Sequence, residues 1–176
     1  MKAFIASAVL LSCSSVASAQ APLASSDKGW TAFFVRGECM MGRSVDAQTE
    51  SAAPDSGIAV SIVWRPDDKS PPAAGQMILS VGPFENRKPV KEPARSIGIL
   101  AGTKQWMLTS EPKYGTHYIL GQQADEVRSS FLTDGVTIEV TRADGSSQSF
   151  KVSSKWFKVA NATFNACMTA LRTEKP

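Results

Sequence analysis

The sequence holds a single histidine, His117, which is the residue best suited by type to acid–base chemistry. An imidazole beside a hydroxyl nucleophile can support hydrolysis, but no Gly-x-Ser-x-Gly turn accompanies this one. The surrounding residues alternate in polarity, which favours a strand histidine on the polar face, opposite Tyr118 and Leu120. We therefore assign no catalytic residue. An exported hydrolase with a site around His117 remains the alternative interpretation.

The cysteines predict a covalent framework. Three are present, and Cys13 falls within a leader sequence, so the mature chain keeps Cys39 and Cys167. Two cysteines in an oxidising compartment most simply form one disulfide. The sequence has no Cys-x-x-Cys motif, and two cysteines with one histidine do not complete a four-ligand zinc site without carboxylates. We expect a structural disulfide, no metal and no other cofactor.

Residues 1–19 have the pattern of a cleaved secretory signal: one lysine, an apolar run over 3–11, and a small-x-small site at 17–19. Residues 10–13 resemble a lipobox, which leaves a lipid anchor through Cys13 as the alternative. No later segment is long and apolar enough to form a transmembrane helix. The sequence therefore predicts a periplasmic or secreted bacterial protein.

The charged and aromatic residues suggest binding more than catalysis. The formal net charge of +3 is too small to indicate a nucleic-acid partner. A basic, proline-broken segment could contact an acidic protein, lipid headgroups or an envelope polymer, and an aromatic residue stands at the entry of the last helix. These candidate binding residues are Arg87, Lys88, Lys91, Arg95 and Trp156. The acidic residues are scattered and do not spell a calcium loop.

The elements that must position these residues are mostly strands, because apolar residues recur with a period of two. Helical spacing appears in two places, from Ala124 to Leu132 and from Ala160 to Leu171, with Asp125 and Glu126 expected in the first turn of the earlier helix. Gly135 is expected to cap that helix in the left-handed conformation. The expected strands cover 30–35, 39–41, 58–64, 77–81, 96–100, 105–109, 116–120, 136–140 and 148–152, and the expected loops cover 42–57, 65–75 and 82–95.

Together these elements predict an α+β fold, with an antiparallel sheet curved into a sandwich or partial barrel and two helices packed on it. Asp144-Gly145 is expected to form a type I′ hairpin turn, which requires positive φ at both central positions. We expect a flexible arm over 20–28, one β-rich domain over 29–171 and a polar tail over 172–176.

A family resemblance is carried by the segments GWTAFFVRGECMM (29–41) and VRSSFLTDGVTIEVTRADGSSQSFKVSSKWFKVANATF (127–164). Their order of helix, glycine, strand, tight turn, strand and amphipathic helix resembles the bacterial invasion-associated locus B family. The resemblance implies a small exported β-rich domain with a role in the cell envelope or in host interaction. It transfers no catalytic residue. The expected function is a non-catalytic binding or interaction protein whose partner is an envelope or host protein or polymer.

Overall fold

The computed structural model describes most of the chain after the leader, namely residues 24–25, 29–35, 37–46, 56–66, 75–90, 94–111, 116–133, 135–154 and 157–173. The predicted leader, Lys91 and Trp156 lie outside these residues. The predicted arm and tail are partly described. Within them, Ala24–Ser25 forms a short strand and Arg172–Thr173 completes the last helix.

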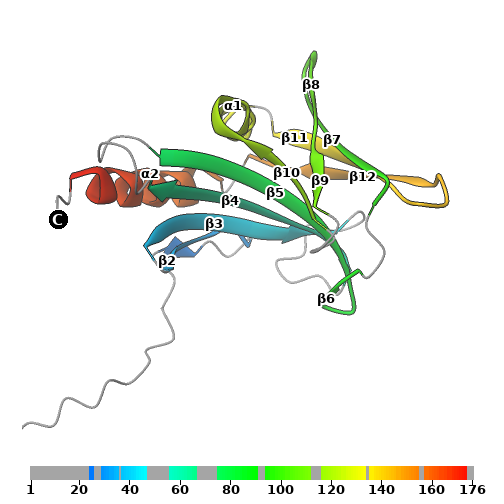
Figure 1. The fold of residues 1–176 in the computed structure, drawn as a ribbon, viewed down its shortest axis with the longest axis horizontal. Coiled ribbons are helices and arrows are strands. Elements are labelled where there is room, and N and C mark those ends of the chain that lie inside the picture. Colours follow the sequence, from blue (N-terminus) through cyan, green and yellow to red (C-terminus); the bar gives the residue numbers. More distant parts are fainter. Residues whose placement is uncertain are drawn as a thin grey trace, which may run out of the picture.

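The described residues form two antiparallel sheets (Figure 1). The first sheet has the strand order β1-β2-β3-β4-β5-β10-β9, with β6 paired to β5. Its strands are β1 (Ala24–Ser25), β2 (Thr31–Val35), β3 (Glu38–Val45), β4 (Gly57–Pro66), β5 (Gly75–Glu85), β6 (Lys88–Pro89), β9 (Thr109–Glu111) and β10 (Thr116–Leu120). The second sheet has the order β12-β11-β7-β8, from β7 (Ser96–Ala101), β8 (Lys104–Met107), β11 (Val136–Thr141) and β12 (Ser147–Val152).

Two helices complete the described fold, α1 (Gly121–Ser130) and α2 (Phe157–Thr173). α1 packs against β5 and β10, and α2 packs against β2 and β3. The chain passes from the first sheet to the second at β7 and returns at β9, so the two sheets are interleaved in sequence. This arrangement confirms the predicted α+β fold with two helices packed on antiparallel strands.

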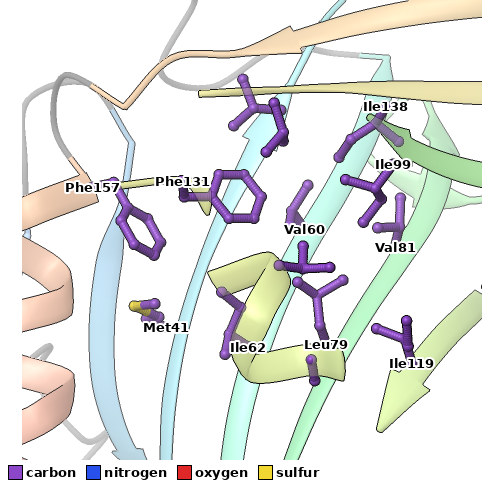
Figure 2. Packing of buried hydrophobic residues seen from close by; sticks show 14 of the residues in the cluster. Met41, Val60, Ile62, Leu79, Val81, Ile99, Ile119, Phe131, Ile138 and Phe157 are labelled. Atoms are coloured by element: carbon purple, nitrogen blue, oxygen red, sulfur yellow. The ribbon is translucent and has the colours of Figure 1, made fainter. Parts of the chain in front are cut away.

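The core lies on the inner face of the first sheet, where alternate residues of each strand are buried. Ile58, Val60, Ile62 and Trp64 are all buried along β4, as the alternation in the sequence predicts. Side chains from the second sheet and both helices join the same cluster (Figure 2). One contiguous core of this kind is what a single folding unit requires.

Three aromatic rings close the core where the two helices meet the first sheet. Trp30 stands edge-on to Phe131 and Phe157, with ring centroids 5.6 and 4.9 Å away. Phe131 and Phe157 are stacked at 5.1 Å, and Figure 2 shows these two rings together. Edge-to-face and offset pairs are the favoured aromatic geometries, so this cluster joins the residue before β2, the C-cap of α1 and the first residue of α2.

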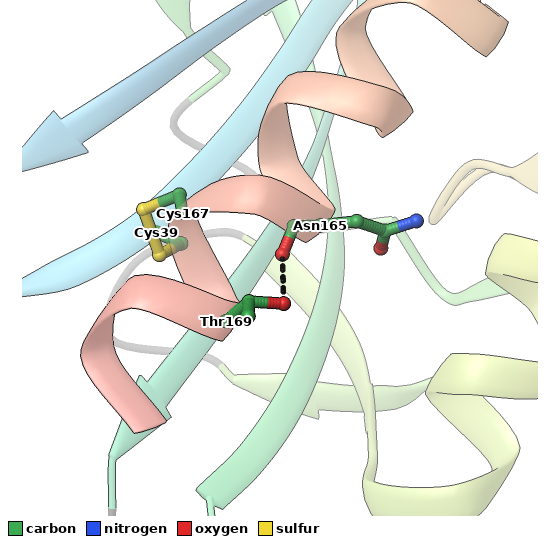
Figure 3. The surroundings of a disulfide bond; sticks show 4 residues. All are labelled: Cys39, Asn165, Cys167 and Thr169. Atoms are coloured by element: carbon green, nitrogen blue, oxygen red, sulfur yellow. Dashed lines mark hydrogen bonds between the residues drawn. A yellow bond between two sulfur atoms is a disulfide. The ribbon is translucent and has the colours of Figure 1, made fainter. Parts of the chain in front are cut away.

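A disulfide joins Cys39 of β3 to Cys167 of α2 (Figure 3). The two Cα atoms lie 5.9 Å apart across a sequence separation of 128 residues. Cys39 is fully buried, and Cys167 is partly buried against the core. The pairing predicted from the cysteine count is therefore present, and it fastens the last helix to the first sheet.

Two strands run far into segments where loops are expected. β3 continues through Gly42 to Val45, where a loop is expected, and β5 continues through Pro83 to Glu85. Proline is tolerated in β5 because β10 ends its pairing at Val81. Beyond that point, the edge of β5 that β10 has left is covered only by the short strand β6, and Val90 N donates to Pro83 O there at 3.1 Å. The N–H that Pro83 lacks would point to this same edge, so no bond to β10 is lost.

The boundaries of α1 also differ from the prediction. The helix begins at Gly121, so Asp125 and Glu126 lie in its second turn, and Asp125 instead pairs with Arg128 at 2.8 Å. The helix ends at Ser130, and Gly135 lies beyond its cap. Gly135 still has a positive φ of 78°, but its role is to let the chain pass close to β12 on the way into β11.

The β11–β12 hairpin does not use the predicted type I′ turn. Gly145 has a φ of 85°, whereas Asp144 has no positive φ. Gly145 N donates to Arg142 O at 3.0 Å, and Arg142 N donates to Ser146 O at 2.8 Å. These bonds define a three-residue loop, in which a tight turn is followed by a left-handed glycine. Asp144 contributes by accepting from Ser146 and not by its own backbone conformation.

Candidate functional site

His117 is buried in the core and does not lie on the polar face. Its pairing partner on β5 is Val81, which faces inward, so His117 and Ile119 face inward too, while Leu120 is 40% exposed. The prediction for this face is wrong because Tyr118, Ile119 and Leu120 are all apolar or aromatic, and the sequence of β10 does not distinguish its two faces. The pairing register with β5 is what shows which face of β10 points inward.

The surroundings of His117 do not match those of a general base. Neither ring nitrogen has a hydrogen-bond partner among the residues that the structure describes. Burial lowers the pKa of the ring below its ordinary value, because the imidazolium loses its solvation, and the nearby Ala94 backbone offsets this only in part. A ring that is 1% exposed, and whose nitrogens are hydrogen-bonded to no hydroxyl or carboxylate in the described part of the chain, lacks the geometry of hydrolysis.

A pocket of about 360 Å³ is lined by residues of both sheets. In Figure 1, the β5–β6 turn and the β11–β12 hairpin, which contribute to its lining, lie at the end of the molecule away from α2. One wall comes from the start of β4, the end of β5, the β5–β6 turn and the segment before β7. The other wall comes from β11, β12 and the loop between them. The lining residues are Ser56, Gly57, Pro83, Phe84, Glu85, Asn86, Val90, Ala94, Val140, Arg142, Ala143, Asp144, Gln148 and Phe150.

The pocket combines apolar walls with polar groups, as small-molecule sites usually do. Phe84 and Val90 contribute from the first sheet and its turn, and Val140 and Phe150 contribute from the second sheet. Val140 and Phe150 are themselves almost completely buried, so their positions are fixed by the core. The second-sheet side of the pocket is thus backed by core residues of β11 and β12, whereas Val90 follows the short strand β6.

The acidic groups of the pocket are occupied by neighbours within the protein. Glu85 Oε1 lies 3.4 Å from Arg142 Nη2, which joins the two walls across the pocket. Asp144 Oδ1 accepts from Ser146 N at 2.8 Å and from Ser146 Oγ at 2.7 Å. These hydrogen bonds lower the pKa of Asp144 below its ordinary value, so its carboxylate stays ionised to lower pH.

The described basic residues of the segment found in the sequence adjoin residues that line this pocket, although none of them is itself a lining residue. Arg87 and Lys88 follow the lining residue Asn86, and Arg95 follows Ala94. The backbone N–H of Arg95 donates to Thr141 O at 2.8 Å, which places Arg95 beside the second sheet. Three of the five predicted binding residues therefore flank one pocket. Lys91 and Trp156 lie outside the described residues.

The turn that carries this segment has an uncommon backbone. Asn86 and Arg87 have φ values of 50° and 61°, the pair of positive angles of a type I′ turn, and Glu85 pairs with Lys88 across it. Asparagine tolerates this conformation, whereas an arginine there costs about 1 kcal/mol or more. The sequence gives a clue to the turn in Glu85-Asn86, but no clue that Arg142, Phe84 and Phe150 meet beside it.

A second hollow, about 450 Å³ and more open, lies between α1, α2, the end of β4 and the start of β5. Its polar groups are bonded to one another. Arg128 Nη1 donates to Asn161 Oδ1 at 2.6 Å and to Asn165 Oδ1 at 3.0 Å, while Arg172 lies over the Trp64 ring at 5.2 Å. We interpret this hollow as a helix–helix contact that stabilises the fold.

Within the described ranges there is no cluster of three or more potential metal ligands. Among the described residues, neither helix combines the length and the apolar character that crossing a membrane requires. Comparisons with family models, with curated proteins and with solved structures each found no match. The resemblance to the invasion-associated locus B family therefore stays a prediction from the sequence, and the pocket has to be interpreted from its own chemistry.

Proposed function

We propose that this chain is an exported, non-catalytic binding protein of the bacterial cell envelope that holds its ligand in the pocket between the two sheets. The observation that carries the proposal is the pocket itself, with apolar walls and the predicted basic segment beside it. Its volume lies within the range of small-molecule sites. The surroundings of His117 favour binding over hydrolysis.

Export is supported by the leader pattern and by the disulfide, because such bonds persist in oxidising compartments. Intact-mass measurement of the protein expressed in a bacterium with its own leader tests this part. Loss of residues 1–19 supports export as a free protein. A lipid-modified N-terminus at Cys13 supports the anchored alternative, and an intact leader on protein in the cytosol contradicts export. The resemblance to a host-interaction family makes a host ligand one candidate for the pocket.

The binding proposal is tested by filling the pocket from an exposed lining position. Gln148 lines the pocket and is exposed, so Gln148→Trp is expected to fold normally and to occupy the ligand space. The purified protein is incubated with a small-molecule extract of the envelope, washed, and its bound compounds are identified by mass spectrometry. We expect compounds that remain with the wild type and are lost from the variant.

The matched control is Lys104→Trp, which adds the same side chain at an exposed position outside the pocket. This variant is expected to retain the wild-type compounds. If Gln148→Trp and Lys104→Trp retain the same compounds as the wild type, the pocket is not the binding site. If the wild type itself retains nothing, the proposed function is wrong.

A further inference from the structure

From the distribution of charge around the pocket, we infer that its ligand is an amphipathic anion, with an apolar body between the sheets and a negatively charged group at the rim formed by Lys88, Arg95 and Arg142. This inference rests on the proposed function and specifies the ligand class of the same site. It depends on which charges are already neutralised within the protein.

The acidic groups of the rim are satisfied by the protein. Asp144 is held by two hydrogen bonds from Ser146, and Glu85 is held by Arg142. Each carboxylate therefore offers little to a cationic ligand, which would have to displace a local partner. An incoming cation gains less here than it would beside an unpaired carboxylate.

The basic groups of the rim are less well satisfied. Lys88 and Arg95 are exposed and form no ion pair with any residue that the structure describes. Lys88 pairs through its backbone with Glu85, which lines the pocket, and Arg95 follows Ala94, which also lines it. The backbones of both residues therefore adjoin lining residues of the pocket, and their charges attract an anion toward this end of the molecule over the distance that salt permits.

Arg142 adds an exchangeable contact. Its ion pair with Glu85 is long, at 3.4 Å, and both side chains are about half exposed. Exposed pairs of this kind contribute little to stability, so a ligand carboxylate or phosphate can replace Glu85 at small cost. A guanidinium binds either group through two parallel hydrogen bonds.

The interior of the pocket requires the other half of the ligand. Phe84 and Val90 line the pocket and are partly exposed, while Val140 and Phe150 lie almost completely buried behind it, and an ion without an apolar part would leave the exposed apolar surface in contact with water. A large polymer does not fit a space of about 360 Å³, although its apolar end group would. The ligand class is therefore an anion that carries an acyl or aromatic body.

Two dyes that share one apolar body test the inference. Anilinonaphthalene sulfonate carries a negative charge, and phenylnaphthylamine is its neutral counterpart. Fluorescence titration of the wild-type protein is expected to show tighter binding of the sulfonate, and added salt is expected to weaken only that dye. Equal affinities for the two dyes, with no effect of salt, would contradict the ligand class.

The charge variants are read against a control with the same change in net charge. Lys88→Gln with Arg95→Gln is expected to weaken the sulfonate about fivefold and to leave the neutral dye unchanged. Lys104→Gln with Lys158→Gln removes two exposed charges elsewhere and is expected to change neither dye. If both double variants weaken the sulfonate equally, only the overall charge matters and the rim has no role.

A variant with the opposite expected effect guards against simple loss of folding. Glu85→Gln releases Arg142 from its ion pair, so it is expected to bind the sulfonate about threefold more tightly. Unchanged or weaker binding would contradict the part assigned to Arg142.

Gln148→Trp distinguishes failure of the binding site from failure of the ligand class. If it retains both dyes at wild-type affinity, the pocket and the proposed function fail. If it loses both dyes while the charge variants have no effect, only the ligand class fails.

The negatively charged group can be a carboxylate or a phosphate. Dodecanoate and dodecyl phosphate, kept below their micelle concentrations, are compared as competitors of the bound sulfonate dye, with neutral decyl maltoside as the control. Displacement by either anion at lower concentration than by the maltoside supports the inference and identifies the group. Displacement by all three alike, or by none, contradicts it.

Discussion

At the scale of single residues, His117 predicts how the protein responds to acid. Its pKa is lowered by burial from an ordinary value of 6.5, so the unfolded chain takes up a proton more readily than the folded protein does. Above about pH 6.5 His117 is neutral in both states and does not lower the free energy of unfolding, and below that pH the free energy of unfolding falls because the unfolded chain binds the proton more readily. Chemical denaturation of the wild type between about pH 5 and pH 7 measures this slope.

His117→Leu is the variant that isolates this effect, because leucine fills the buried position without titrating. The slope of unfolding free energy against pH in this window is expected to be smaller in the variant than in the wild type. Equal slopes would show that acid sensitivity comes from the carboxylates. The sequence places His117 in a strand correctly, but its inward orientation follows only from the pairing with Val81.

At the scale of elements, Gly135 shows why a glycine can be essential without capping a helix. It has a φ of 78°, and a Cβ at this position would stand 2.5 Å from Val152 O. Gly102 also has a positive φ, of 57°, but nothing lies within 4 Å of its Cβ position. Gly102→Ala is expected to destabilise the protein by about 1–2 kcal/mol, through backbone strain alone. Gly135→Ala is expected to lower the melting temperature clearly more, because the clash with Val152 O adds to the same strain. Equal melting temperatures for the two variants would contradict the role of the contact with β12.

Most strands can be predicted from the sequence, because alternation along β4, from Ile58 to Trp64, is decided by local hydrophobicity. Their ends are less predictable. Pro83 stays inside β5 only because β10 stops pairing at Val81. This depends on the tertiary arrangement of the two strands and not on the local sequence of β5. The loop at Asp144 is of the same kind, since its turn type depends on how β11 and β12 approach each other.

The pocket is a property of the whole molecule, and this is why only part of it is visible in the sequence. Arg87, Lys88 and Arg95 stand out as a local cluster of charge. The lining residues Arg142 and Phe150 come from the side of the second sheet, and nothing local to either segment predicts that they meet Glu85 and Asn86 in one pocket. The basic segment can therefore be identified in advance, whereas the cavity beside it requires the interleaved path of the chain between the sheets.

The same interleaved path makes the single disulfide important for the molecule as a whole. Cys39 and Cys167 close a loop that contains all the strands from β4 to β12. Removing the bond is therefore expected to loosen α2 from the first sheet and to enlarge the ensemble of unfolded chains. Cys39→Ala with Cys167→Ala is expected to melt about 10 °C lower than the wild type. Dithiothreitol is expected to lower the wild type to the melting temperature of the double variant and to leave that variant unchanged. A wild type that keeps its melting temperature after complete reduction would show that the bond does not stabilise the fold, and that the contacts of α2 with β2 and β3 hold the helix without it.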